Sequence, residues 1–237
     1  MKITGNKYEL KDIFSKQFEF HVPFYQDPYA WTTEKAEGLF EDLYRNFKKN
    51  KEGDKDAECF LGTIVLIKKE NSPEADIVDG QQRLTTLTIL FAVLADCFLW
   101  DQEENFKQYI IEEKEEFENI ESKPRLFLGE EDQEFFETYI QNLCLNELQL
   151  LDPEELEDDA QRYIQENCEL FEHKIRECFG NKKDEIYAFA KFLVNSCSLL
   201  VVSADATDDA KSAFMVRTVM DYTEMDLPDR IYSLFLI

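Results

Sequence analysis

The first hundred residues show a hydrophobic pattern that predicts a small sheet joined to helices. Phe18 to Val22 alternates apolar and polar residues, as a short strand does, before the chain enters an aromatic-rich loop at Pro23. From Thr33 onward apolar residues recur at helical spacing, and Thr32 or Thr33 is suited to cap that helix. Phe60 to Ile67 is a β-branched apolar run typical of a strand. We therefore expect a strand, a loop, a helix and a second strand in this order.

A strand, a tight turn and a long helix should follow. Lys68 to Ala75 is a polar turn, and Asp76 to Val78 begins a strand that ends at Asp79-Gly80. The apolar residues after Gly80 recur at helical spacing and predict one apolar helix face. That face would carry Leu84, Leu87, Leu90, Phe91 and Leu94.

The second half of the chain is predicted to be mainly helical. Residues 101–191 contain charged amphipathic segments, Ser198 to Ser203 returns to β-type residues, and Asp208 to Met220 resumes a helical pattern. The apolar end at Leu234 to Ile237 indicates a truncated piece or a docked terminal helix. We expect an α+β fold with a sheet-bearing lobe at residues 1–100 and a predominantly helical lobe at residues 101–237. Helix breaks are expected at Ser122 to Pro124, Asp152-Pro153 and Gly180-Asn181.

Composition narrows the class of protein. The 237 residues are 44% hydrophobic and 14% aromatic, enough to bury a substantial core. No apolar run approaches the roughly 20 residues of a membrane helix, and no signal peptide is evident, so we expect a cytoplasmic protein. The six cysteines form no Cys-x-x-Cys pair, which favours buried thiols over a zinc site or disulfides.

The net charge of -25 argues against broad, nonspecific binding to nucleic acid. A few clustered basic residues still suffice for a local site, because charges more than about 8 Å apart are largely screened at physiological salt. The simpler interpretation of the acidic helices is that they keep the chain soluble.

The run from Asp79 to Leu87 reads Asp-Gly-Gln-Gln-Arg-Leu-Thr-Thr-Leu and is the most informative part of the sequence. Gly80 permits a sharp turn, and the backbone N–H groups of the first helical residues have no partner within the helix. Arg83 can pair with an anion through two parallel hydrogen bonds. Such a turn can hold a phosphate group.

The other side chains of this run add polar groups. Asp79, at the strand end, is suited to bind a metal ion or to orient a water molecule. The side-chain amides of Gln81 and Gln82 are suited to a base, a sugar or a phosphate oxygen, and Thr85 and Thr86 add hydroxyls. In the structural alternative, Asp79 only caps the helix and the glutamines are solvated. The helix-terminus field contributes only about 0.3–1 kcal/mol per exposed charge, so nucleotide binding requires several donors to converge.

The chain resembles the N-terminal domain of GmrSD-type type IV restriction enzymes, whose signature is a strand followed by the motif of Asp79 to Leu87. The motif is not a Walker A loop, because it lacks Gly-x-x-x-x-Gly-Lys. Further similarity lies in Val22 to Gln26, Pro28 to Trp31, Phe60 to Val65, Pro124 to Leu126 and Glu131-Asp132, so the resemblance spans most of the chain.

The resemblance implies a fold related to ParB and sulfiredoxin, in which the Asp-Gly-Gln-Gln-Arg turn binds and hydrolyses a nucleoside triphosphate, GTP or ATP, with Mg²⁺. Asp79 would hold the metal, and it would act in catalysis with Gln82 and Arg83. The nucleotide-binding set would be Gly80, Gln81, Gln82, Arg83, Thr85 and Thr86.

The resemblance further implies that the chain recognises modified DNA and works with an HNH nuclease domain or subunit. An HNH centre needs paired histidines, and this sequence has only His21 and His173. We therefore expect that the nuclease is supplied elsewhere. An oligomer is compatible with this arrangement.

The aromatic loop from Pro23 to Trp31 is the predicted DNA-recognition element. Tyr25, Gln26 and Tyr29 are suited to read a modified base by stacking and hydrogen bonding, whereas we expect Phe24 and Trp31 to pack against the sheet. The alternative for the whole loop is ordinary packing.

Lys123 and Arg125 are predicted to contact DNA phosphates, with a solvated surface pair as the alternative. Two segments depart from the family pattern. Asp27 replaces an arginine, and Arg217 to Glu224 lacks the expected Asn, Arg and Gly. These departures support a rival hypothesis, a degenerate, noncatalytic module that regulates a partner nuclease. An acidic mimic of DNA is a third alternative that rests on net charge alone.

Overall fold

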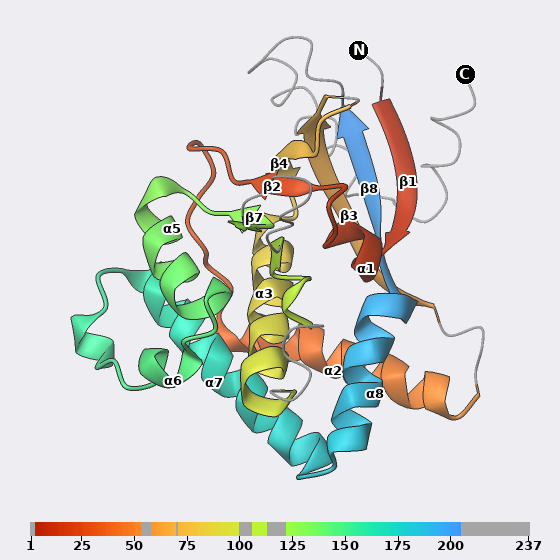
Figure 1. Cartoon of the computed structure of the whole chain (residues 1–237), viewed down its shortest axis with the longest axis vertical. Coiled ribbons are helices and arrows are strands. Elements are labelled where there is room, and N and C mark those ends of the chain that lie inside the picture. The colour runs from red at the N-terminus through yellow and green to blue at the C-terminus, as the bar shows by residue number, and fades with distance from the viewer. Residues whose placement is uncertain (1–2, 54–57, 70, 100–105, 113–121, 205–237) are drawn as a thin grey trace.

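The computed structural model of the chain describes residues 3–53, 58–69, 71–99, 106–112 and 122–204. Its centre is a six-stranded mixed sheet in the order β1-β8-β3-β4-β2-β7, with the helices gathered against one side and one end of it (Figure 1). β8 lies parallel to β3 and antiparallel to β1, and β4 lies antiparallel to β3 and parallel to β2. The strands of this sheet are β1 (Ile3–Glu9), β2 (Glu19–His21), β3 (Cys59–Lys68), β4 (Glu74–Asp79), β7 (Leu126–Phe127) and β8 (Cys197–Ala204). The α+β class predicted from the sequence is confirmed.

The helices confirm the predicted start near Thr33 and the helix after Gly80. Thr32 occupies the N-cap position of α2, although its side chain makes no capping hydrogen bond, whereas the Asp158 side chain caps α7. The α-helices are α1 (Leu10–Ile13), α2 (Thr33–Lys51), α3 (Gln81–Val93), α5 (Glu130–Phe136), α6 (Leu145–Leu148), α7 (Asp159–Phe179) and α8 (Lys183–Ser196). The described residues also form two π-helical turns, η1 (Leu94–Phe98) and η2 (Glu137–Gln141), and one 3-10 turn, η3 (Pro153–Glu155).

Strands from both sides of the predicted lobe boundary at residue 100 form one sheet. β8 lies between β1 and β3, and β7 pairs with β2 through Phe20 and Leu126. A further two-stranded sheet joins β5 (Ile111–Glu112) to β6 (Lys123–Pro124). Strands of two residues carry no alternating pattern, which explains why this region reads as helical in sequence.

Helix α3 differs from the prediction of a single apolar face. All its residues from Leu84 to Val93 are buried, because the helix lies between the sheet and the other helices (Figure 1). Phe91 contacts the rings of Phe14 and Phe106, at 5.1 and 5.5 Å between centroids. A helix that is apolar on all sides is typical of the centre of a core, and this burial gives the turn before α3 a rigid base.

The remaining sequence predictions on fold concern thiols, membranes and the C-terminal segment. Cys59, Cys168 and Cys197 are buried and, like the other cysteines, are free thiols. Within the described part of the chain, no helix is long and apolar enough to cross a membrane. The predicted helix at Asp208 to Met220 and the apolar end at Leu234 to Ile237 lie outside the described residues.

Candidate functional site

The turn between β4 and α3 requires glycine. Gly80 has a φ of +99°, in the left-handed region, and stands immediately before the first residue of α3. A Cβ atom on Gly80 would lie 2.5 Å from Cγ2 of Ile64, a buried residue of β3. The turn is therefore held against the neighbouring strand, and it positions Asp79 and Arg83 on either side.

Arg83 and Asp79 form the charged part of this site. Arg83 is half-buried, and its Nη1 donates a hydrogen bond of 2.9 Å to the carbonyl oxygen of Thr63. Gly62 lies beside the guanidinium group, since a Cβ there would be 3.4 Å from Cζ, Nη1 and Nη2. Burial lowers the pKa of Arg83, and the charge of the exposed Asp79 opposes this shift. The guanidinium group thus lies beside β3 with one of its donors used.

Gln81 and Gln82 hold the aromatic loop through their side-chain amides. Gln81 is buried and its Nε2 donates to the carbonyl oxygen of Asp27 at 2.9 Å. Gln82 uses both ends of its amide, because Nε2 donates to Pro28 O at 3.0 Å and Oε1 accepts from the Ala30 N–H at 2.8 Å. Gln81 is therefore not solvated, whereas Gln82 stays partly exposed, and both side chains connect the turn to the loop.

Tyr29 lies inside the protein. It is 1% exposed, and its hydroxyl shares a hydrogen bond of 2.8 Å with Thr86 and accepts one of 2.9 Å from Asn167 Nδ2. Burial raises the pKa of Tyr29 above its ordinary value. Thr86 also donates to the Gln82 carbonyl, whereas the buried Thr85 hydroxyl has no hydrogen-bond partner among the described residues. Tyr29 and Thr86 thus join the loop to α3 and α7.

A buried carboxyl group supports the same loop. Asp132, in α5, is 5% exposed, and burial raises its pKa to about 6. The nearby Asp158 adds to the rise, and a hydrogen bond from the Tyr29 backbone opposes it. One carboxyl oxygen, Oδ1, has no partner among the described residues. Ionisation of Asp132 therefore lowers the stability of the folded protein at the point where it supports the loop.

The exposed part of the loop is its first half. Phe24 is 96% exposed and Tyr25 is 46% exposed, and their rings meet edge to face at 5.6 Å. The expectation that Phe24 packs against the sheet is wrong, whereas Trp31 does pack against the core. Gln26 Nε2 donates to the Val78 carbonyl at 2.9 Å, which fixes the loop to the end of β4. The loop thus presents two exposed aromatic rings, and the adjacent Gln26 fixes it to the strand that ends at Asp79.

Lys123 and Arg125 lie apart from this turn. Lys123 forms an ion pair with Glu19 of β2, and Glu112 is 3.9 Å from its Nζ. Arg125 is 9% exposed, and its Nε donates to the Gln108 carbonyl at 2.5 Å. The structure therefore brings the Asp79 to Arg83 turn and the aromatic loop together, but it does not add these two cations to them.

The start of α3 leaves donors available. Among the described residues, nothing accepts a hydrogen bond from the backbone N–H groups of Gln81, Gln82 and Arg83. The described chain holds no group of three or more His, Cys, Asp or Glu residues able to bind a metal ion. Mg²⁺ often uses only one or two carboxylates together with substrate phosphates, so Asp79 fits a metal that arrives with a nucleotide.

Several contributors to this region were not among the sequence candidates. Gly62 and Thr63 lie beside Arg83, Asn167 holds Tyr29, and Phe24 is the most exposed aromatic ring of the described residues. Gly62 and Thr63 lie in Phe60 to Val65, a segment that resembles the family, and this resemblance was the sequence feature that pointed to them. Asn167 is 138 residues from Tyr29 in sequence, and no sequence feature indicated that it contacts Tyr29.

Comparison with known proteins gives one family. No curated protein matches the chain. The model of the GmrSD restriction endonuclease N-terminal domain matches residues 10–227, which include the whole described site. The chain therefore belongs to the GmrSD restriction endonuclease N-terminal domain family.

Proposed function

We propose that the chain is a nucleotide-binding, NTP-hydrolysing sensor module of a modification-dependent DNA restriction system, with its HNH nuclease supplied elsewhere. Membership of the GmrSD family supports a role in a restriction system. The observation that carries the finer proposal is the turn from Asp79 to Arg83. It combines a carboxylate, a guanidinium group and backbone N–H groups that have no acceptor among the described residues.

Arg83 would hold phosphate. Its Nη1 is oriented by the Thr63 carbonyl, and the described residues leave Nε and Nη2 without acceptors. An oriented guanidinium group loses little freedom when it binds an anion. Together with the N–H groups at the start of α3, it would provide the several converging donors that a phosphate requires.

Asp79 would hold Mg²⁺ and orient the attacking water. The metal, when bound with GTP or ATP, would neutralise charge on the phosphates. Asp79 is exposed and stands close enough to Arg83 for their charges to interact, so it can face the same ligand. Phosphoryl transfer depends mainly on such positioning and charge stabilisation.

The aromatic loop would read the modified DNA. Phe24 and Tyr25 offer exposed rings for stacking, whereas Gln26 and Tyr29 have their polar groups bound inside the protein. Gln81 and Gln82 join this loop to the nucleotide turn. A conformational change in the turn or in the loop would therefore be transmitted to the other element, as a sensor requires.

A second function has a specific observation in its favour. Both ends of the Gln82 amide are used by the loop, so Gln82 acts in catalysis only if those hydrogen bonds open. A noncatalytic module that binds a nucleotide and regulates a partner nuclease needs no such opening. The departure at Asp27, on the exposed side of the loop, agrees with this alternative.

The test is titration of the purified chain with Mg²⁺ and labelled GTP or ATP, following both binding and phosphate release. We expect Arg83→Ala to abolish turnover while the protein remains folded, and Arg83→Lys to retain only weak activity because it loses the paired donors. Arg45→Ala is the matched control, since Arg45 is exposed on α2 and pairs only locally with Asp42. Hydrolysis at the wild-type rate in Arg83→Ala would refute the assignment. Binding without turnover in the wild type favours the regulatory module.

A further inference from the structure

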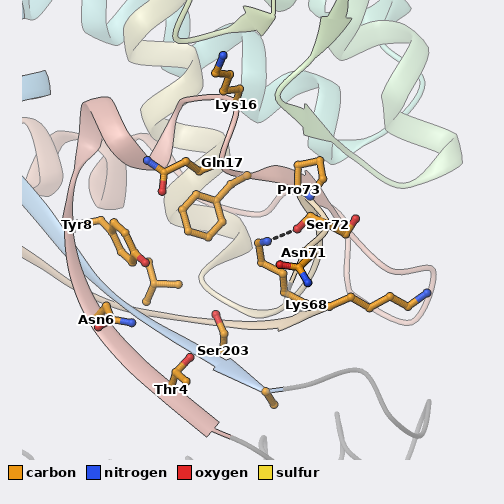
Figure 2. Close-up of a pocket in the computed structure, with 14 residues that line it drawn as sticks. Thr4, Asn6, Tyr8, Lys16, Gln17, Lys68, Asn71, Ser72, Pro73 and Ser203 are labelled. Atoms are coloured by element: carbon orange, nitrogen blue, oxygen red, sulfur yellow. Dashed lines mark hydrogen bonds between the residues drawn. The ribbon is translucent and has the colours of Figure 1, made fainter.

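A polar hollow lies at the end of β4 away from the Asp79 turn, where none of the described helices covers the sheet. It has a volume of about 520 Å³, within the range of roughly 300–1,000 Å³ that small-ligand sites occupy. Figure 2 shows its walls, with Thr4 and Asn6 of β1 and Ser203 of β8 on one side and Asn71 to Pro73 of the β3–β4 turn on the other. With residues 16–18 between α1 and β2, the hollow is built from four separate segments of the chain.

The strand residues point into the hollow because of their register. Thr4 pairs with Ser203 and Asn6 pairs with Val201, so these side chains share one face of the sheet. Lys68 stands four residues after Ile64 in β3 and lies on the same face as that core residue. The core-facing side of the sheet thus changes at this end from apolar to polar side chains.

The charge of the hollow is opposite to that of the protein. Its lining includes Lys16, Lys68 and Lys69, and no described lining residue is acidic, although the chain carries 51 Asp and Glu residues. Lys16 and Lys69 are exposed, and no carboxylate in the described part of the chain pairs with either. Because screening confines electrostatic effects to about 8 Å at physiological salt, the acidic residues far from the hollow have little effect on these three cations.

Lys68 is the cation within the hollow. Its Nζ donates to the Ser72 carbonyl and lies 5.7 Å from the centre of the Phe18 ring. Burial lowers the pKa of Lys68, and no described acidic residue counters this shift. An ammonium group has three donors, and the described residues accept from one of them, which leaves two for a ligand. Figure 2 shows Lys68 pointing toward the middle of the lining residues.

The remaining lining offers hydroxyls and apolar surface. Thr4, Tyr8 and Ser203 supply hydroxyl groups, while Phe18 and Val201 supply an apolar floor. The rings of Tyr8 and Phe18 meet edge to face at 5.5 Å between centroids. A cationic end beside aromatic and aliphatic surface is complementary to a phosphate group carried on a ring-shaped body.

We propose that this hollow is a second ligand site, which binds a small phosphate monoester of the nucleoside monophosphate class through Lys16, Lys68 and Lys69. The site is separate from the turn at Asp79. The two lie at opposite ends of β4, which spans Glu74–Asp79, about 17 Å apart at the usual rise per strand residue. A ligand here would bridge β1, β3 and β8 without touching Arg83.

The test is isothermal titration of the full chain with AMP in the absence of Mg²⁺. We expect saturable binding to the wild type, at least tenfold weaker binding to Lys16→Gln/Lys69→Gln, and unchanged binding to Arg83→Ala. The control Lys35→Gln/Lys49→Gln makes the same change in charge at exposed positions of α2 outside the hollow. Adenosine, which lacks the phosphate, should bind at least tenfold more weakly than AMP.

A second measurement locates the ligand without relying on variants. AMP should protect Lys16, Lys68 and Lys69 from acetylation in the folded protein, as read by mass spectrometry, and should leave Lys35 and Lys49 reactive. The proposal is overturned if AMP does not bind, if the control double variant loses as much affinity, or if only Arg83→Ala loses binding. This last outcome would place AMP at the Asp79 turn. If the chain does not hydrolyse GTP or ATP, the function proposed for the Asp79 turn fails, but the proposal of a second site is not affected.

Discussion

Replacing Gly80 by alanine tests the geometry of the turn directly. The backbone at Gly80 has a φ of +99°, and an L-residue in the left-handed region costs about 1–2 kcal/mol. The new methyl would lie 2.5 Å from Cγ2 and 3.0 Å from Cβ of the buried Ile64, far inside ordinary carbon contact. Overpacking of this kind costs about 1–3 kcal/mol. Alanine also reduces the conformational freedom of the unfolded chain, which stabilises the folded state by about 0.4–1 kcal/mol.

The net expectation for Gly80→Ala is a loss of about 2–4 kcal/mol in the free energy of unfolding. Urea denaturation followed by circular dichroism measures it, with an unchanged dependence on denaturant showing that the folded state stays compact. Gly38→Ala is the control, because Gly38 lies within α2 with nothing near its added Cβ. That variant should gain about 0.5–1 kcal/mol from helix propensity.

A double variant separates the steric part from the backbone part. Ile64→Ala removes the methyl that Gly80→Ala would meet, so the double variant should lose less stability than the sum of the singles, by about 1 kcal/mol or more. The reasoning is refuted if Gly80→Ala costs less than about 1 kcal/mol, or if the two changes are additive.

Three further predictions concern the support of the aromatic loop. Tyr29→Phe should lower the free energy of unfolding, measured by urea denaturation, by about 1–3 kcal/mol, because the buried Thr86 and Asn167 side chains lose their hydrogen bonds to the phenolic hydroxyl. A loss below about 0.5 kcal/mol would contradict this prediction. Gln82→Ala removes two hydrogen bonds to the loop and should speed limited proteolysis between residues 24 and 30, with no change elsewhere. Asp132 has a folded-state pKa raised to about 6, so its favourable contribution is present below pH 4 and is lost as the pH rises through 6. Asp132→Asn should therefore be more stable than the wild type by about 1–3 kcal/mol at pH 7.5 and equally stable near pH 4. Thermal or urea unfolding measures both values. A constant difference in stability across this pH range would rule out ionisation as the cause.

Much of the local structure was predictable from residue patterns. The strand at β3, the helix after Thr33 and the sharp turn at Gly80 depend on neighbours within a few residues. β-branched runs, helical spacing and glycine report such local preferences well. The two-residue strand β7 was missed, because a strand that short has no periodicity and forms only where β2 offers a partner.

The roles of the polar side chains depended on distant partners. Gln82 reads in sequence as a solvated or ligand-binding amide, yet its partners lie 52 and 54 residues away in the aromatic loop. Tyr29 reads as a recognition residue, yet Asn167 holds it from 138 residues away. Phe24 reads as a packing residue and is exposed, because none of the described elements covers the start of that loop.

The sequence by itself determined the α+β class, the strand-turn-helix unit around Asp79 to Arg83 and the family resemblance, because these rest on local preferences and a contiguous motif. Only the tertiary structure decided which motif side chains bind other parts of the protein and which keep polar groups accessible. It also placed Lys16, Lys68 and Lys69 around one hollow at the far end of β4. The physical reason is that a polar group's role follows from the partners that folding brings to it, and those partners come from separate parts of the chain.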